Sequence, residues 1–209
     1  ILHYQTFVQY AVVDGKFGYG QTVTPFAVQL GIAKCKAMGL SAIGLRNAGH
    51  IGRVGDWAEM AAAQGLVSMH YVNAAQSLLV APFGGVDRRI STAPYTVGVP
   101  RKGQDPLILD FATSVVAEGK VLNASLGGKK IPADALIDKD GSISGDPHVL
   151  YGRYSPTGPR SYRGGTGAIR AFGEHKGSGL AFMVEVLGGS LTGTGAADEK
   201  RAKWANGMM

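Results

Sequence analysis

The chain has 209 residues, 45% of them hydrophobic and 17% charged, which excludes a disordered protein and provides enough apolar material for a core. Its formal net charge is +6, but the basic residues are scattered and do not alternate with aromatic residues as in a nucleic-acid-binding surface. We therefore expect no nucleic acid partner, and the positive charge favours small anions such as carboxylates and phosphates. The single cysteine, Cys35, excludes an internal disulfide, and no apolar stretch is long enough to span a membrane. These features predict a cytoplasmic protein without a membrane partner.

The first elements that the sequence predicts are a helix and a buried strand. Thr24 and Pro25 form a typical helix start, and we expect the helix to run to about Met38 and to end at Gly39. Within it, Cys35 is expected to be a small buried residue and not a nucleophile. The face expected to lie against the core is formed by Phe26, Leu30, Ala33 and Ala37. The apolar segment 41–46 that follows is typical of a buried strand.

A glycine-rich segment, residues 44–55, stands between that strand and a helix predicted over residues 56–64. Small-molecule sites in α/β proteins are common at such junctions, where main-chain N–H groups are exposed. His50 lies at its centre and could exchange a proton with a substrate hydroxyl or carbonyl group, although it could equally order the loop. Arg46 and Arg53 could bind a carboxylate, or each could be a solvated surface charge.

Further strands are predicted over residues 66–73, 95–100 and 106–110, with a turn at residues 82–85. A helix should follow over about residues 115–124, and residues 131–155 should be irregular. A last helix, over about residues 177–187, is apolar on nearly every side, which predicts that it is buried. The uneven alternation of strands and helices indicates an α/β fold that need not contain a regular doubly wound sheet.

Two further segments carry polar groups that suit a cofactor. Residues 110–114 place a carboxylate and two hydroxyl groups at the end of a strand, where they could bind ribose or phosphate oxygens, but an ordinary helix N-cap is the alternative that sequence alone favours. In residues 173–179, glycines and Lys176 precede the last helix, which suits an anion site, or else a glycine loop with Lys176 in solvent. Neither a GxGxxG nor a Walker A motif occurs in the sequence.

No metal site is predicted. Residues 138–141 resemble the start of a calcium loop, but Ile143 and Val149 stand where that loop requires its glycine and its closing glutamate. His70 and His148 share no metal-ligand spacing with each other or with His50. We therefore expect both to be structural or exposed histidines.

Four motifs occur in a fixed order along the chain: residues 46–55, 81–85, 109–114 with 118–120, and 174–180. Each motif is weak alone, and the order of all four makes a strong match. Together they resemble the type 2 malate/L-lactate dehydrogenase family, and within it the hydroxycarboxylate dehydrogenase branch. The family also contains ureidoglycolate and diketogulonate dehydrogenases.

The resemblance implies oxidation of a 2-hydroxy acid by NAD or NADP, or reduction of the 2-oxo acid, with malate, lactate or a related hydroxycarboxylate as the substrate. It also implies a mixed-sheet α/β cofactor domain that is not a Rossmann fold, and a homodimer. By motif, His50 matches the family's proton acceptor, and Asp138 matches an aspartate near the site. The implied cofactor contacts are Asp110, Phe111, Ala112, Thr113, Ser114, His175, Lys176 and Gly177. The implied substrate contacts are Arg46, Arg53 and Asn73.

The sequence departs from the family in three ways. The N-terminal helical region, with its Ser-His-Gly segment, and the C-terminal cofactor-contacting segment have no counterpart, so we expect residues 1–209 to be one NAD(P)-binding and catalytic domain truncated at both ends. Such a domain would be inactive by itself. Ala74 also follows Asn73, where some relatives carry a serine that touches the substrate.

Two other classes of function stay open on sequence alone. One is a non-catalytic module that binds anions or nucleotides through residues 110–114 and 173–179. The other is a metal-dependent hydrolase, although the spacing of the histidines and carboxylates offers no ligand set for one.

Overall fold

A computed structural model describes residues 3–153 and 161–209 of the chain. It divides into two compact units. Unit 1 comprises Ile1–Gln76, Ala93–Phe111 and Met183–Met209, and unit 2 comprises Ser77–Thr92 and Ala112–Phe182. That the two units act as one cofactor-binding and catalytic domain stays a prediction.

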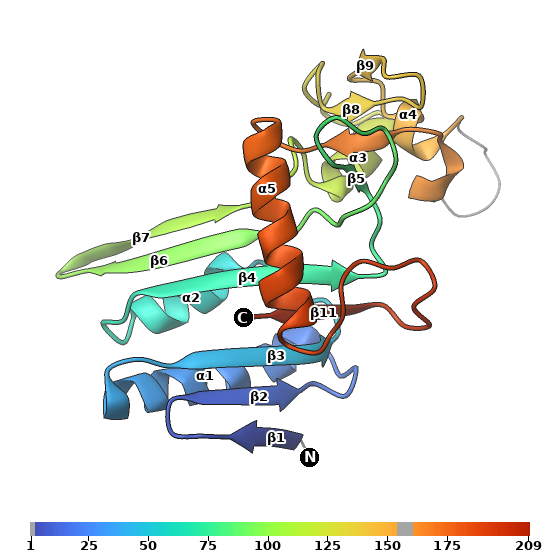
Figure 1. Ribbon diagram of the computed structural model, residues 1–209. Helices are drawn as coiled ribbons and strands as arrows, with labels where there is room; N and C mark the ends of the chain where they lie inside the picture. The colour runs from blue at the N-terminus through green and yellow to red at the C-terminus, as the bar shows by residue number, and fades with distance from the viewer. Residues whose placement is uncertain (1–2, 154–160) are drawn as a thin grey trace. The chain divides into compact units, whose positions relative to one another are not determined.

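Unit 1 is built on a seven-stranded mixed sheet with the strand order β1-β2-β3-β11-β4-β6-β7 (Figure 1). The strands are β1 (His3–Thr6), β2 (Tyr10–Asp14), β3 (Ala42–Ala48), β4 (Ser68–Ala75), β6 (Tyr95–Arg101), β7 (Gln104–Phe111) and β11 (Ala205–Met208). β2 and β3 are parallel, whereas β11, from the end of the chain, lies antiparallel between β3 and β4. The mixed sheet confirms the predicted fold class, and the predicted strands correspond to β3, β4, β6 and β7.

Helices cover both faces of this sheet. The α-helices α1 (Gly20–Met38) and α2 (Gly55–Ala62) pack on one face, against β3 and β6 (Figure 1). The other face carries η2 (Glu185–Ser190), a π-helix that packs on β4 and β11. Side chains alternate along β4, so Val72 joins the core under α1 while the next residue, Asn73, reaches toward η2.

The ends of α1 were predicted with mixed success. The helix begins at Gly20 and not at Thr24, so Pro25 lies inside it. Its end is confirmed, because Gly39 adopts a left-handed φ of 81° and its N–H donates to the carbonyl of Cys35.

The predicted buried face of α1 was wrong except at Leu30, which is partly buried and packs against the core. Phe26 is 37% exposed, and Ala33 and Ala37 are exposed as well. The buried residues are Val23, Thr24, Ala27, Val28 and Gly31. The sequence contains two stripes at helical spacing, and the one with smaller side chains faces the sheet because it lets the helix approach closely, with Gly31 against Ile43.

Unit 2 contains shorter elements around a core of its own. Its four-stranded sheet has the order β5-β10-β8-β9. The elements are β5 (Val80–Ala81), α3 (Glu118–Ser125), β8 (Leu136–Ile137), β9 (Ile143–Ser144), α4 (His148–Tyr151), the 3₁₀ helix η1 (Tyr162–Gly164) and β10 (Ala168–Arg170). Residues 131–155, predicted to be irregular, thus contain two short strands and a helical turn, and their last two residues lie outside the described part. The half-buried Arg88 donates to the carbonyls of Tyr162, Gly165 and Gly167 and so fixes the segment before β10.

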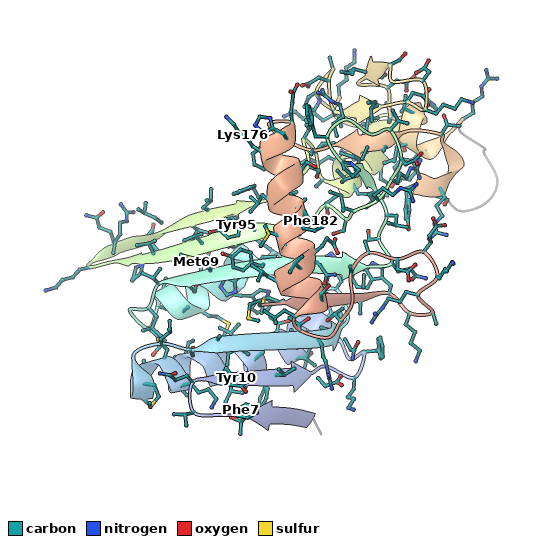
Figure 2. The ribbon with its side chains drawn as sticks, viewed as in Figure 1. Phe7, Tyr10, Met69, Tyr95, Lys176 and Phe182 are labelled. Atoms are coloured by element: carbon teal, nitrogen blue, oxygen red, sulfur yellow. The ribbon has the colours of Figure 1, made fainter. Side chains whose placement is uncertain are left out.

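The last predicted helix corresponds to α5 (His175–Val184), which begins in unit 2 and continues directly into η2 of unit 1. The prediction that it is buried holds for only part of the helix, because Ala181 and Val184 are buried whereas Phe182 is 63% exposed and projects from the helix (Figure 2). The buried turn is η2, in which Gly188 and Gly189 lie against β4. Among the described residues, no helix combines the length and the apolar character needed to cross a membrane.

Candidate functional site

His50 is an exposed residue of unit 1, on the loop between β3 and α2. The N–H of Gly49 donates to the carbonyl of Gly18 at 2.8 Å. At Gly20, the first residue of α1, an added Cβ would lie 2.4 Å from the carbonyl oxygen of His50, so only glycine fits there. The indole N–H of Trp57 donates to the carbonyl of Ile51 at 3.1 Å. The fold therefore holds the main chain on both sides of His50.

Two contacts orient the imidazole ring of His50. Its Nδ1 accepts a hydrogen bond from the N–H of Gly52 at 3.0 Å, and the ring stacks parallel to Trp204 with 5.9 Å between centroids. Because Nδ1 accepts this bond, the neutral ring carries its hydrogen on Nε2. In that state Nε2 can donate to a carbonyl oxygen. It can take a hydroxyl proton only after Nδ1 has released the Gly52 N–H.

Arg46, which stands before His50 on β3, already has a carboxylate partner. Its Nε lies 3.1 Å from Asp14, whose side chain is buried. Burial opposes ionisation of Asp14, but hydrogen bonds from the Lys16 N–H and the Asn47 amide, together with the charge of Arg46, hold the pKa of Asp14 below its usual value. The Arg46 side chain remains 42% exposed, so its outer nitrogens could still bind a second carboxylate.

Arg53 lies between two carboxylates of α2. Its guanidinium nitrogens are 2.6 Å from Asp56 and 2.8 Å from Glu59. Hydrogen bonds to Glu59 and then to Asp56 raise the pKa of Arg53. A substrate carboxylate would have to compete with both, and the predicted substrate contact of Arg53 stays a prediction.

Asp110, at the end of β7, caps a helix that is distant in sequence. Its Oδ2 accepts the N–H of Gly55, the first residue of α2, at 2.8 Å, and its Oδ1 accepts the Thr96 hydroxyl at 2.7 Å. The alternative that this segment caps the next helix was wrong, because α3 begins after Ala117 without a side-chain cap. Asp110 therefore ties the third motif to the end of the first. The neighbouring Phe111 packs edge to face on Tyr95.

Asn73 is completely buried, and its side-chain amide is bonded to protein groups. The Nδ2 group donates to the carbonyl of Gly195 at 2.8 Å and to Glu185 at 3.2 Å, and the Oδ1 atom accepts the N–H of Gly207. This geometry does not favour the expected substrate contact, which stays a prediction.

In unit 2, the end of the third motif meets the loop before α5. The N–H of Phe172 donates to the carbonyl of Thr113 at 3.0 Å, and Ser114 forms a β-bridge with Ala171. Ala112 is partly buried, and Thr113 and Ser114 are buried. The structure thus brings together two of the predicted cofactor-contacting segments, which lie far apart in the sequence.

Lys176 is exposed at the start of α5 (Figure 2). Its N–H donates to the carbonyl of Gly173, and that of Gly177 donates to Phe172. The sequence had suggested free N–H groups at this helix start, but these two bond to carbonyls of the preceding loop. An anion here would therefore rely mainly on the Lys176 ammonium group.

The second and fourth motifs also meet in unit 2. The ring of His175, which is exposed, packs on the edge of Phe83 with 5.8 Å between centroids. The N–H of Phe83 donates to the Ser178 hydroxyl at 3.0 Å, and the turn predicted at residues 82–85 is confirmed by a hydrogen bond between Gly85 and Pro82.

Asp138 belongs to unit 2, at the turn between β8 and β9. It accepts hydrogen bonds from the Thr166 hydroxyl at 2.6 Å and from the Lys139 N–H at 2.7 Å. The Thr166 bond first, and then the Lys139 bond, lower the pKa of Asp138. The carboxylate is therefore ionised at neutral pH, and its expected catalytic role stays a prediction.

A pocket of about 550 Å³ in unit 1 is lined by residues of α1, β3 and β4, among them Cys35 and His70. None of the predicted site residues lines it. Burial lowers the pKa of His70 to about 4, so this histidine is neutral at pH 7.

His148 bonds to Asp146 in unit 2. Over residues 3–153 and 161–209, no cluster of three histidine, cysteine or acidic side chains could hold a metal ion.

Three contacts of the predicted site involve residues that sequence reasoning missed. Asp14 pairs with Arg46, Trp204 stacks on His50, and Asn206 bonds to the main chain of Ile51. Asp14 lies outside all four motifs. No periodicity connects Trp204 or Asn206 to a loop that lies about 150 residues earlier, since Ile51 and Asn206 are 155 positions apart.

The mixed sheets, together with the lack of a GxGxxG motif, define an α/β protein outside the Rossmann class. Residues 4–208 match the model of the malate/L-lactate dehydrogenase family, and the chain belongs to that family.

Among curated proteins, the chain is 42% identical over 181 residues to hydroxycarboxylate dehydrogenase B of Escherichia coli K12. This alignment covers 87% of this chain and 47% of that protein. It is 38% identical over 186 residues to malate dehydrogenase of Pyrococcus abyssi, covering 88% and 48% respectively. The chain thus spans about half the length of these curated relatives.

Solved structures agree with this assignment. Malate dehydrogenase from Pyrococcus horikoshii OT3 superposes with a TM-score of 0.79 at 27% identity, covering 99% of this chain and 55% of that one. Sulfolactate dehydrogenase from Methanocaldococcus jannaschii gives a TM-score of 0.77 at 30% identity, covering 100% and 58%.

Proposed function

We propose that this chain carries the proton-transfer residue and part of the cofactor site of a dehydrogenase that interconverts a 2-hydroxy acid and its 2-oxo acid. The observation that carries the proposal is the exposed imidazole of His50 on a loop whose main chain is fixed on both sides. The printed names of the relatives, which include hydroxycarboxylate and malate dehydrogenases, support this reaction class.

In this proposal His50 exchanges a proton with the oxygen on carbon 2. In the oxidising direction, the neutral ring accepts the hydroxyl proton on Nε2 and therefore carries its own hydrogen on Nδ1. In the reducing direction, the imidazolium ring, with a hydrogen on each nitrogen, gives its Nε2 proton to the oxygen on carbon 2 and returns to the neutral ring. Both steps need a hydrogen on Nδ1, so in both directions the ring must first release the Gly52 N–H.

Arg46 is the better of the two arginines for the substrate carboxylate. It has one carboxylate partner, Asp14, whereas Arg53 has two close partners. A guanidinium group has five N–H donors, so Arg46 can keep Asp14 through Nε and offer its terminal nitrogens to a substrate.

The residues of unit 2 fit the chemistry of a dinucleotide. Its phosphates need a cation, and Lys176 provides an exposed ammonium group. Thr113 and Ser114 are buried beneath the loop that precedes α5, where the Thr113 carbonyl accepts the N–H of Phe172. Lys176 and His175 are the exposed residues among the predicted cofactor contacts of unit 2. When bound, NAD or NADP supplies the nicotinamide ring that takes up or gives the hydride of carbon 2. Lys176 would hold a phosphate group, with His175 beside it.

The test is to follow NADH and NADPH absorbance with pyruvate, oxaloacetate, 2-oxoglutarate and phenylpyruvate, in the presence and absence of EDTA. The assay is run on residues 1–209 and on a chain extended at both ends to the length of the relatives, of which residues 1–209 span about half. We expect the extended chain to turn over at least one acid with one cofactor, unaffected by EDTA. Cofactor binding without turnover of any acid by either chain would contradict the proposal and support a non-catalytic nucleotide-binding module. Activity that EDTA abolishes would instead indicate a metal-dependent reaction.

A further inference from the structure

A buried asparagine of β11 bonds to the main chain next to His50. The Oδ1 atom of Asn206 accepts the N–H of Ile51 at 3.1 Å. The Nδ2 group of the same side chain donates to the carbonyl of Asn73 on β4 at 2.7 Å. Asn206 is only 6% exposed, so these two protein groups, and not water, determine where its amide lies.

The chain of hydrogen bonds continues away from the loop through Asn73. Its Nδ2 group reaches Glu185, at the first turn of η2, and the carbonyl of Gly195. Glu185 also accepts the N–H of Ala197 at 2.9 Å. Asn73 and Glu185 are both buried, so the network connects η2 to the loop of His50 through the interior of unit 1.

A network of this kind is stiff. If the Asn206 amide turned, buried donors and acceptors would lose their partners, and a buried polar group without a partner is destabilising. The N–H of Ile51 is therefore held in one position. Ile51 follows His50 directly, and the next N–H, that of Gly52, bonds to Nδ1 of the His50 ring. A shift of Ile51 would consequently move both the ring and the donor that orients it.

We propose that Asn206, supported by Asn73 and Glu185, is a positioning residue for His50. The inference rests on the proposed function, in which His50 exchanges a proton with the substrate. It gives Asn73 a role within the protein interior, where its main-chain carbonyl accepts from Asn206 and its side-chain Oδ1 accepts the N–H of the next residue, Gly207, instead of touching the substrate.

The test compares Asn206→Ala with a matched control, Thr192→Val. Thr192 is equally buried in unit 1, and its hydroxyl donates to the carbonyl of Gly188 at 2.7 Å without contacting Ile51. Both substitutions remove a buried hydrogen bond and should lower the melting temperature. Only Asn206→Ala should change the NMR titration curve of the His50 imidazole, and it should lower kcat by about 10- to 100-fold, the effect expected of a misplaced catalytic group. The Kd for NADH should stay within about twofold.

A second variant covers the case in which Asn206→Ala does not fold. Asn206→Gln keeps an uncharged amide but moves it by one methylene group, so a folded Asn206→Gln protein should also show a changed His50 titration curve and a lowered kcat, and an unchanged curve and kcat in it would overturn the proposal. The proposal is overturned if Asn206→Ala lowers the melting temperature as Thr192→Val does and leaves both kcat and the His50 curve unchanged. An unaltered protein with no turnover of any 2-oxo acid would contradict the proposed function alone, because the NMR comparison would still decide whether Asn206 positions the ring.

Discussion

Unit 1 and unit 2 surround their predicted site residues in different ways. In unit 1, Arg53, Asp110 and Asn73 are engaged by protein groups, and Arg46 is partly engaged. His50 is the contrasting case, because in the described part of the chain no protein group bonds to its Nε2 atom. In unit 2, the exposed Lys176 and His175 stand at the start of α5, directly after a loop that buried neighbours support.

The difference shows that residue type and motif do not reveal which side chains are available to a ligand. Asp110 and Lys176 both lie in motifs that resemble cofactor-binding segments, yet Asp110 uses both carboxylate oxygens inside unit 1. We infer that unit 1 contributes proton transfer through His50, and that unit 2 contributes cofactor affinity through Lys176.

The largest effect is expected from His50→Gln. Loss of a general acid–base group should lower kcat by about 10²- to 10⁴-fold, while the Kd for NADH stays within about twofold. Steady-state kinetics and a fluorescence titration with NADH measure the two quantities. His148→Gln is the control, since His148 is exposed in unit 2 and bonds only locally, to Asp146. Equal turnover by His50→Gln and the unaltered protein would remove His50 from the mechanism.

The next effect concerns the pH dependence of stability in unit 1. Burial lowers the pKa of His70 from 6.5 to about 4, so the folded protein resists protonation of a group that the unfolded chain protonates readily. Stability from this group is complete above about pH 6.5, and it should fall by about 3 kcal/mol as the pH drops to about 4. Urea unfolding at pH 7 and pH 4.5 should show a smaller difference in His70→Leu than in the unaltered protein. An identical difference in both would mean that His70 is not buried as described.

The smallest effect is expected from Lys176→Met in unit 2. Removal of one charged partner of a phosphate should weaken NADH binding by about tenfold, and more at low salt, with kcat at saturating NADH little changed. Lys139→Met is the control, since Lys139 is another exposed lysine of the same unit. A weakening of the same size in both variants would point to a general effect of charge rather than to a phosphate contact.

Local signals predicted much of the fold. Gly39 ended α1 where a left-handed residue was needed, and the strands predicted over residues 95–100 and 106–110 correspond to the β6–β7 hairpin. The buried face of α1 could not be predicted, because two stripes have helical spacing and the sheet selects between them. The central position of β11 could not be predicted either, since nothing in the sequence of these four residues indicates that they pair with β3 and β4.

The sequence predicted which segments form the candidate site but not the distant residues that hydrogen-bond to them. The hydrogen bond from Gly55 to Asp110 spans 55 positions, and that from Ile51 to Asn206 spans 155. Periodicity and spacing act over one element, so they predict which residues share a loop and not which distant side chain will fix it. For that reason Asp110 was read as a cofactor contact or a local cap, and Asn206 was not considered.

The most direct test of the proposed division of roles is NMR mapping of ligands on ¹⁵N-labelled protein, first with NADH and then with oxamate, an unreactive analogue of a 2-oxo acid. The account predicts that NADH shifts the amide signals of Thr113, Lys176 and Gly177, and that adding oxamate shifts the ring signals of His50 and the amide of Gly52. The account is contradicted if NADH binds without shifting the residues of unit 2, or if oxamate binds and leaves His50 unchanged.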